Sequence, residues 1–298
     1  MITRIDTNVE TAIALLKKDE VVAIPTETVY GLAGNALNPE TVLKIYEVKQ
    51  RPSFDPLIVH TNSLTKISTF VKNIPDIIFK LSEEFSPGPL TYVLPKSDLI
   101  PDIVSSGLLS FPLAAPSANL FGKISPTKAE HVYNQLQGKI PFILDGGNCK
   151  IGIESTIVSF HNNKLQVLRL GGITIDQLYD TVGSRNVVFH QAEQINAPGQ
   201  LKSHYATQTP MLIGDIEELI LKYSDKKLAV LSFEKEYSQI KNQVVLSKKG
   251  DLKEAAQKLF QAMHHLDSLH ADIILTEVFP KTGLGLAIND RLTRAAYR

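Results

Sequence analysis

The chain has 298 residues, of which 43% are hydrophobic and 21% charged, and its 31 basic residues balance 31 acidic ones. These values are ordinary for globular proteins, so they exclude a disordered chain, and the length is that of about two domains. The zero net charge argues against a broad basic face for nucleic acid, while a single cysteine and the lack of a long apolar run predict a cytoplasmic protein without a membrane segment.

Helix and strand patterns alternate over the first two thirds of the chain. Thr7 and Glu10 stand at capping-box spacing before apolar residues that recur every three or four positions, which predicts a first helix. Asn38 and Pro39 begin a second helix, because proline favours the first helical position. This alternation predicts an α/β or mixed-sheet domain. We expect further helices at 76–85, from 125 onward and at 174–182, and strands at 21–24, 57–59, 90–94, 142–144, 155–160, 164–170 and 186–190.

A polar stretch without apolar periodicity, residues 191–210, indicates a linker. Beyond it the alternation resumes, which divides the chain into a first domain at 1–196, a linker at 197–209 and a second α/β domain at 210–298. Arg291 and Arg294, on the last helix, are expected at the surface or in ion pairs between domains. We expect strands at 211–213, 228–233 and 272–275, and helices at 215–223, from 251 and at 284–297.

The commonest signatures of nucleotide and metal sites do not occur. The sequence contains no GxxxxGK[ST], no GxGxxG after a strand, no HExxH and no CxxC. We therefore predict no protein-held metal centre. His264, His265 and His270 are expected on the solvated side of a helix.

Two segments near the N-terminus carry polar side chains where a ligand could bind. Residues 25–32 (PTETVYGL) follow a predicted strand, and ligands of open α/β sheets gather at such strand ends. A helix cap followed by core packing would explain them as well. Lys49 and Arg51 end the second helix, where they could bind a polyphosphate or only complement the helix dipole.

Two later segments also have residue types that would suit a ligand-binding loop. Residues 114–119 are mostly small, and Ser125 before a proline is also a good helix N-cap. No GxSxG and no nearby base mark Ser117 as a nucleophile. Glycines at 146–147, 152 and 171–172 mark turns or a close ligand approach. Taken singly, none of the four segments identifies a reaction.

Taken in order, these segments resemble the YrdC domain of threonylcarbamoyl-AMP synthases. After the linker, SHYA at 203–206 and the stretch 283–296 resemble the C-terminal extension of the two-domain form. The matching stretches of the first domain are PTETVYGL, KxRPxxxPLIVH, PGPLT at 87–91, APSAN with GKxSPT, GIEST and LRxGG.

The resemblance implies an α/β fold: a YrdC-type twisted mixed sheet with helices and a concave cavity, followed by a small Rossmann-like domain. It implies an ATP-dependent nucleotidyltransferase that makes threonylcarbamoyl-AMP and pyrophosphate from L-threonine, bicarbonate and ATP, with magnesium as the implied cofactor. The product would pass to a complex that transfers the threonylcarbamoyl group to tRNA, with at most weak tRNA contact by this chain.

The resemblance also assigns site residues. Lys49 and Arg51 take the catalytic part, since such a reaction relies on positioning and on cations that stabilise phosphate charge. Tyr205 belongs to a lid over the cavity. The residues assigned to threonine are Thr28, His60, Ala115 and Ser155. The residues assigned to ATP are Arg51, Asp55, Ser117, Asn119, Ser125, Arg169 and Tyr205.

Two departures from the family pattern stand out. Asp55 occupies a position where asparagine is usual, and its charge would repel phosphate. Family members also carry a strand and helix, with a VAVRxP-like stretch whose arginine contacts substrate, where this chain runs from 105–112 almost directly into APSAN. We expect this deletion near residue 109 to weaken threonine and ATP binding.

Three alternatives remain at this stage. A tRNA- or double-stranded-RNA-binding module is disfavoured by the neutral charge. Another carbamoyl-transferring enzyme would carry zinc-finger and acylphosphatase-like regions, which the sequence does not contain. A weakened paralogue is consistent with the missing segment.

Overall fold

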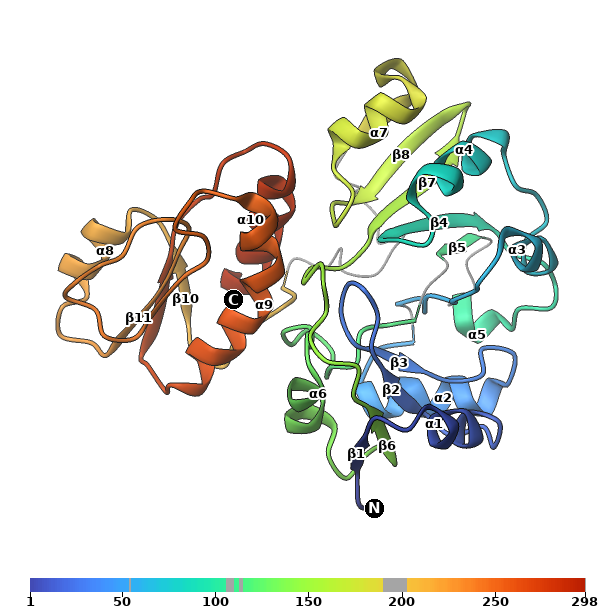
Figure 1. The fold of residues 1–298 in the computed structure, drawn as a ribbon, viewed down its shortest axis with the longest axis horizontal. Helices are drawn as coiled ribbons and strands as arrows, with labels where there is room; N and C mark the ends of the chain where they lie inside the picture. The colour runs from blue at the N-terminus through green and yellow to red at the C-terminus, as the bar shows by residue number, and fades with distance from the viewer. Residues whose placement is uncertain (54, 106–109, 113–114, 190–202, 298) are drawn as a thin grey trace.

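The computed structural model describes residues 1–53, 55–105, 110–112, 115–189 and 203–297. They form an α/β protein with three sheets, and the last of these belongs to a compact C-terminal part beside the rest of the chain (Figure 1). The predicted boundary at residue 196 and residues 197–202 of the predicted linker lie outside the described residues. Within the described part, every helix is too short or too polar to cross a membrane.

The first sheet has the strand order β1-β6-β2-β3, with β3 antiparallel to β2 and the other pairs parallel. Its first helix begins after Asn8, whose side chain accepts a hydrogen bond from the Thr11 amide, so the cap is Asn8 and not the predicted pairing of Thr7 with Glu10. Asn38 caps the second helix as predicted. The elements are β1 (Arg4–Asp6), α1 (Val9–Leu16), β2 (Val22–Ile24), β3 (Gly31–Ala33), α2 (Pro39–Lys49), α6 (Ala129–Leu136) and β6 (Phe142–Leu144).

The second sheet has the order β5-β4-β7-β8-β9 and is mixed, since β4 pairs with β7 in parallel and β7 with β8 in antiparallel orientation. A capping box of Thr174 and Gln177 begins its last helix, which packs on α4. The elements are α3 (Leu64–Phe70), α4 (Asp76–Phe85), β4 (Leu90–Pro95), α5 (Asp102–Ser105), β5 (Ser110–Pro112), β7 (Thr156–His161), β8 (Lys164–Arg169), α7 (Ile175–Val182), η1 (Ser184–Asn186) and β9 (Val187–Phe189).

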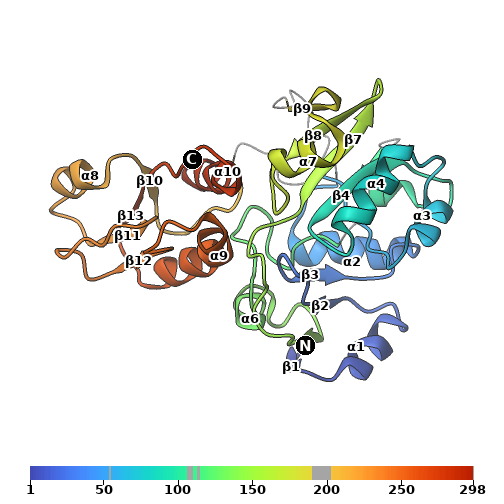
Figure 2. The same cartoon turned by 45° about the horizontal axis from the view of Figure 1, so that its top comes forward.

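The C-terminal sheet is parallel throughout, with the order β10-β13-β11-β12. Its strand β11 is buried on both faces, since Val230 packs toward α8 and Ala229 toward α9 and α10. Helices α9 and α10 lie between this sheet and the rest of the protein (Figures 1 and 2). The elements are β10 (Met211–Ile213), α8 (Ile216–Lys222), β11 (Leu228–Ser232), β12 (Gln243–Val245), α9 (Leu252–Ser268), β13 (Ile273–Thr276) and α10 (Leu284–Ala296).

One hydrophobic cluster crosses from the first part of the chain into the C-terminal part. Val29, Ile124 and Tyr205 are buried in it together with Phe260 of α9 and Ile288 of α10. The two parts therefore share a core, and this contact holds α9 and α10 against the loops that follow β2 and precede α6.

The fold class predicted from the sequence is confirmed, and two of the predicted elements differ from the structure. The described residues 57–59 are buried but pair with no strand, because the Leu57 amide donates instead to the Val104 carbonyl. The helix expected from 125 begins only at Ala129, because residues 125–128 form contacts with the cavity wall and with the Tyr30 amide.

Candidate active site

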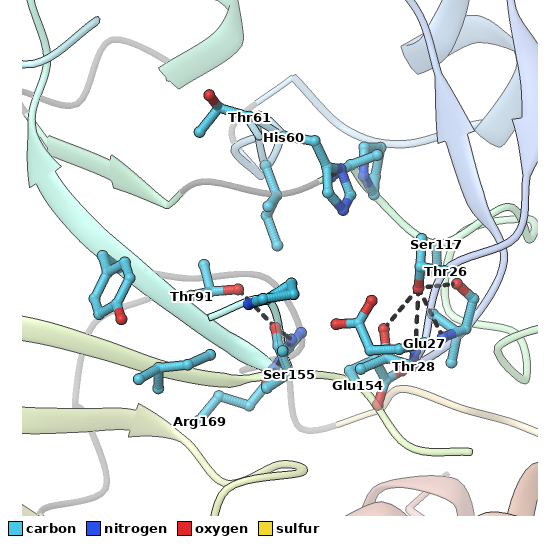
Figure 3. A pocket seen from close by; sticks show the side chains of 18 of the residues that line it. Thr26, Glu27, Thr28, His60, Thr61, Thr91, Ser117, Glu154, Ser155 and Arg169 are labelled. Atoms are coloured by element: carbon cyan, nitrogen blue, oxygen red, sulfur yellow. Dashed lines mark hydrogen bonds between the residues drawn. The ribbon is translucent and has the colours of Figure 1, made fainter. Parts of the chain in front are cut away.

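A cavity of about 220 Å³ lies where the loop after β2 faces the ends of β4, β7 and β8. Its wall comes from several separate stretches of the first part of the chain, between Thr26 and Arg169, and from His204 and Tyr205. Polar side chains from both sheets point into it, including Thr28, Ser117 and Ser155 (Figure 3). The topology thus collects motifs that are far apart in the sequence.

The four residues assigned to threonine all line this cavity. Ser155 Oγ lies 2.7 Å from Thr91 Oγ1 and accepts a hydrogen bond of 3.1 Å from Arg169 Nη2. Thr28 Oγ1 lies 2.9 Å from Thr26 Oγ1, whose own hydroxyl donates to the Val29 carbonyl. Each hydroxyl is therefore held in place by a neighbour before any ligand binds.

His60 and Ala115 form a second group on the opposite wall. The Ala115 amide donates to Nδ1 of His60, which leaves Nε2 as the ring nitrogen able to donate to a ligand. Desolvation lowers the pKa of His60, so the imidazole stays neutral at pH 7. A neutral donor at this position suits a carboxylate or carbonyl oxygen.

Three residues at the end of α2 form a buried cluster below the cavity. Lys49 donates to the main-chain carbonyls of Ser117 and of Asn119, the latter over 2.7 Å. Arg51 Nη2 lies 2.8 Å from Asp55 Oδ1 and donates over the same distance to the Pro56 carbonyl. Of Lys49, Arg51 and Asp55, the cavity wall includes Arg51 alone.

Burial shifts the titration of this cluster. It lowers the pKa of Lys49 well below its ordinary value, and the nearby Arg51 lowers it further. Burial raises the pKa of Asp55, although Arg51 opposes the shift. The cluster supports the loop at 115–119 from below, and its charge reaches a ligand chiefly through Arg51.

Two other residues assigned to ATP bind within the protein. The Asn119 side-chain amide donates to the carbonyls of Leu120 and Lys123, and Ser125 Oγ donates to Glu154 Oε1 over 2.6 Å. Eight of the twelve assigned residues line the cavity. The four that do not are Lys49, Asp55, Asn119 and Ser125.

Glu154 lines the cavity but was not singled out from the sequence. Its Oε2 accepts hydrogen bonds from Nε and Nη2 of Arg291, both 3.2 Å long. Burial alone would raise its pKa, but Arg291, Arg169 and Ser125 outweigh burial and lower it. Its position directly before Ser155 in the GIEST motif could have identified it as a site residue. Its pairing with Arg291 could not be predicted, because the two residues lie 137 positions apart.

Tyr205 joins the C-terminal part to the cavity. It adopts a left-handed conformation with φ of 61°, and its ring centroid lies 5.3 Å from that of Phe260. The Arg291 guanidinium lies 5.6 Å from the Tyr205 ring centroid. No described residue forms a hydrogen bond with the Tyr205 hydroxyl, so it is a polar group that a ligand could satisfy.

Two expectations for the C-terminal part change. Arg291 is fully buried in an ion pair between the two parts, which confirms the pairing and excludes a surface position. His264, expected in solvent, is half-buried and stacks on His131 of α6 with 3.9 Å between ring centroids, whereas His265 and His270 are exposed. Across the described residues, no group of three His, Cys, Asp or Glu side chains could hold a metal ion.

Comparison with known proteins places these features in a family. A family profile described as telomere recombination matches residues 14–110 and 108–171, and a profile of the C-terminal domain of threonylcarbamoyl-AMP synthase matches 173–297. The threonylcarbamoyl-AMP synthase of Bacillus subtilis is 39% identical, with 98% of this chain and 93% of that protein covered. The enzyme of the same name from Pyrococcus abyssi is 36% identical, with 96% and 94% covered.

A solved structure gives the same result. The crystal structure of P. abyssi Sua5 complexed with L-threonine superposes on this chain with a TM-score of 0.90 at 34% identity. The superposition covers 99% of this chain and 97% of the other. The two parts of the chain are therefore arranged as in that protein.

The comparisons also bear on the missing segment. The alignment with the B. subtilis enzyme spans 323 positions, whereas the chain has 298 residues, so at least 25 positions, the difference between the two, are gaps in this chain. The two stretches matched by the first profile meet at residues 108–110. This is the place where the sequence pattern predicts a missing segment.

Proposed function

The chain belongs to the family of threonylcarbamoyl-AMP synthases, and we propose that its cavity joins L-threonine, bicarbonate and ATP to give threonylcarbamoyl-AMP and pyrophosphate. The observation that carries the proposal is the convergence of eight motif residues from separate segments on one cavity. The enzyme would act as a nucleotidyltransferase, because the adenylyl group moves from pyrophosphate to a carbamate oxygen.

The chemistry requires little of the protein beyond positioning. The threonine amine and bicarbonate form a carbamate with loss of water, a carbamate oxygen attacks the α-phosphorus, and pyrophosphate leaves. No protein nucleophile is needed, which agrees with the absence of a nucleophile motif around Ser117. Orientation of the two reactants and positive charge near the phosphates would supply the rate enhancement.

The cavity offers separate groups for each reactant. Thr28, His60 and Ser155 supply neutral hydroxyl and imidazole groups, which suit the carboxylate and hydroxyl of threonine. Arg51 and Arg169 supply positive charge on the cavity wall, which suits the phosphates. The unpartnered hydroxyl of Tyr205 would contact the nucleotide from the C-terminal side.

Magnesium would enter with ATP. The cavity carboxylate Glu154 is already paired with Arg291 and Ser125, and Asp55 is paired with Arg51, so these residues do not form a resident magnesium site. We propose that the ion is held by the phosphates and water, as magnesium in nucleotide sites often is. It would offset phosphate charge, and no step is assigned to a metal ligand of the protein.

The product would serve a partner complex that modifies tRNA. The balanced charge disfavours the alternative of an RNA-binding module. A steeply salt-dependent, submicromolar affinity for tRNA without nucleotide turnover would favour that alternative.

Pyrophosphate release, measured with each substrate omitted in turn, tests the proposal. We expect release only when ATP, threonine and bicarbonate are all present, and its loss when a chelator removes magnesium. Release that does not depend on threonine would contradict the assigned reaction, and release in excess chelator would contradict the role of magnesium.

A further inference from the structure

The C-terminal part reaches the cavity wall through one buried ion pair. Arg291 of α10 is 0% exposed and donates through Nε and Nη2 to Oε2 of Glu154, which lines the cavity. A third donor of Arg291, Nη1, reaches the Leu170 carbonyl over 2.6 Å. These bonds attach the last helix to both segments that carry Ser155 and Arg169.

The ion pair also decides the charge of the cavity. Arg51 lies 2.8 Å from Asp55, so its positive charge on the cavity wall is partly offset. Glu154 and Arg169 are close enough for each to shift the pKa of the other, and Arg291 lowers the pKa of Glu154 more than Arg169 does. Without Arg291, the Glu154 carboxylate would act chiefly on Arg169 and would oppose any phosphate brought to it.

We propose that Arg291 is a positioning residue of the cavity: by neutralising Glu154, the C-terminal part keeps the positive charge of Arg169 effective toward the ATP phosphates. This inference rests on the proposed function, since it assumes that the cavity receives a polyphosphate. It assigns the last helix an electrostatic part in substrate binding, 122 residues beyond Arg169 in the numbering of the chain.

The groups around the pair restrict the alternatives. Arg291 also contacts Asp290 Oδ2 at 3.2 Å, and Ser125 binds the other oxygen of Glu154. Glu154 therefore keeps one hydrogen bond when Arg291 is replaced, and its carboxylate stays oriented while losing its counter-charge. A substitution of Arg291 thus removes the counter-charge of Glu154 while Ser125 still holds one carboxylate oxygen.

The test compares full-length Arg291→Met, Glu154→Gln and the double variant. Dissociation constants for ATP and for pyrophosphate are measured by calorimetry, and the KM values for ATP and threonine by pyrophosphate release. We expect Arg291→Met to weaken ATP binding about 10-fold or more, with a smaller change in the KM for threonine. The double variant should bind ATP within about 3-fold of Glu154→Gln alone, because the unpaired carboxylate has been removed.

Arg294→Met is the matched control, since Arg294 lies one turn along the same helix and pairs with Asp290 at 2.9 Å. It should bind ATP as the wild type does. Arg291→Lys keeps the charge but not all of the guanidinium hydrogen bonds, so its ATP affinity should lie between those of the wild type and Arg291→Met, and it guards against a variant that fails to fold.

Several results would overturn the inference. They are unchanged ATP affinity in Arg291→Met, a double variant as weak as Arg291→Met, and a loss in Arg291→Lys equal to that in Arg291→Met. A wild-type chain that binds neither ATP nor pyrophosphate overturns it as well. Threonine-dependent pyrophosphate release by the wild type tests the proposed function separately, because that measurement does not depend on the Arg291 variants.

Discussion

The Lys49 ammonium donates a 2.7 Å hydrogen bond to the carbonyl of Asn119, seventy positions further along the chain. A second bond reaches the Ser117 carbonyl, so one side chain fastens the loop at 115–119 to the end of α2. Since Ala115, Pro116 and Ser117 of this loop line the cavity, Lys49 shapes the site from beneath.

Replacing Lys49 should therefore destabilise the protein. Lys49→Met leaves two carbonyls without their donor, and we expect the free energy of unfolding to fall by about 2–4 kcal/mol in urea titrations. Lys44→Met, on the exposed side of the same helix, is the control and should change it by less than about 1 kcal/mol. Equal stability of the two variants would contradict the anchoring role and favour a direct role of Lys49 at the phosphates.

Two glycines with the same backbone conformation should respond differently to alanine. Gly152 has φ of +81°, and a Cβ there would lie 2.3 Å from the Gln257 carbonyl oxygen of α9, whereas Gly147 has φ of +78° and open space. Gly147→Ala should lower the free energy of unfolding by about 1–2 kcal/mol, because alanine is strained in a left-handed backbone conformation. Gly152→Ala should cost about 1–3 kcal/mol more, because α9 must move away from the cavity wall.

Urea unfolding and limited proteolysis measure the difference between the glycine variants. Gly152→Ala should also be cleaved faster between the two parts of the chain. Indistinguishable stabilities would show that α9 does not press on Gly152 in solution.

Stability should fall with acid because of the stacked histidines at the boundary. Burial chiefly lowers the pKa of His131 to about 2 and that of His264 to about 4, with Lys128 and the neighbouring ring also acting on His131. Below pH 6.5 these two histidines take up protons in the unfolded chain but stay neutral in the folded chain. Each histidine then lowers the free energy of unfolding by up to about 1.4 kcal/mol per pH unit until the pH reaches its pKa in the folded chain.

A pH series of urea titrations on wild type and on His131→Gln/His264→Gln isolates this effect. The variant should lose less stability than the wild type between pH 7 and pH 5. His265→Gln, at an exposed position of the same helix, should follow the wild type. Parallel curves for the wild type and the double variant would rule out the pair as the cause.

Ser155 should matter for threonine more than for ATP. Ser155→Ala removes a hydroxyl held by Thr91 and Arg169 at the cavity wall, and we expect the KM for threonine to rise about 10-fold. Ser159, on the strand β7 that follows Ser155, lies outside the cavity wall, so Ser159→Ala should leave the KM unchanged. A KM for ATP that rises while that for threonine stays constant would reverse the assignment.

The missing segment predicts weaker substrate binding than in the relatives. The family resemblance implies a substrate-contacting arginine that this sequence lacks near residue 109, so we expect dissociation constants for ATP and threonine about 10-fold above those of the B. subtilis enzyme under the same conditions. Calorimetry on the two proteins side by side gives the comparison. Equal affinities would mean that another group in this chain replaces the arginine.

The sequence predicted the fold well where a local signal was strong. Asn38-Pro39 and Asp251 begin helices as expected because proline and side-chain caps act over three or four residues. Strand β3 and the unpaired segment at 57–59 were not foreseen, since their hydrogen-bond partners come from distant parts of the chain. Short apolar runs alone do not decide between these outcomes.

The site shows the same limit. Motif order predicted that Thr28, His60, Ser155 and Arg169 lie together, and all four line one cavity. It could not show that Lys49 points to main-chain carbonyls, because side-chain direction depends on the loop packed above it. Nor could it show that Glu154 is paired with Arg291, because that contact joins residues 137 positions apart.

The hydrophobic cluster around Tyr205 has a consequence for how the chain can be divided. Its members come from the loop after β2, from the segment before α6 and from two C-terminal helices, so separating the parts would expose Val29, Ile124 and Ile153 to water. A chain that ends before residue 203 would expose a hydrophobic patch where α9 and α10 had packed, and it would tend to aggregate. The two parts should therefore unfold together in one cooperative transition. The boundary visible along the sequence is unsuited to truncation, and the two parts should be expressed as one chain.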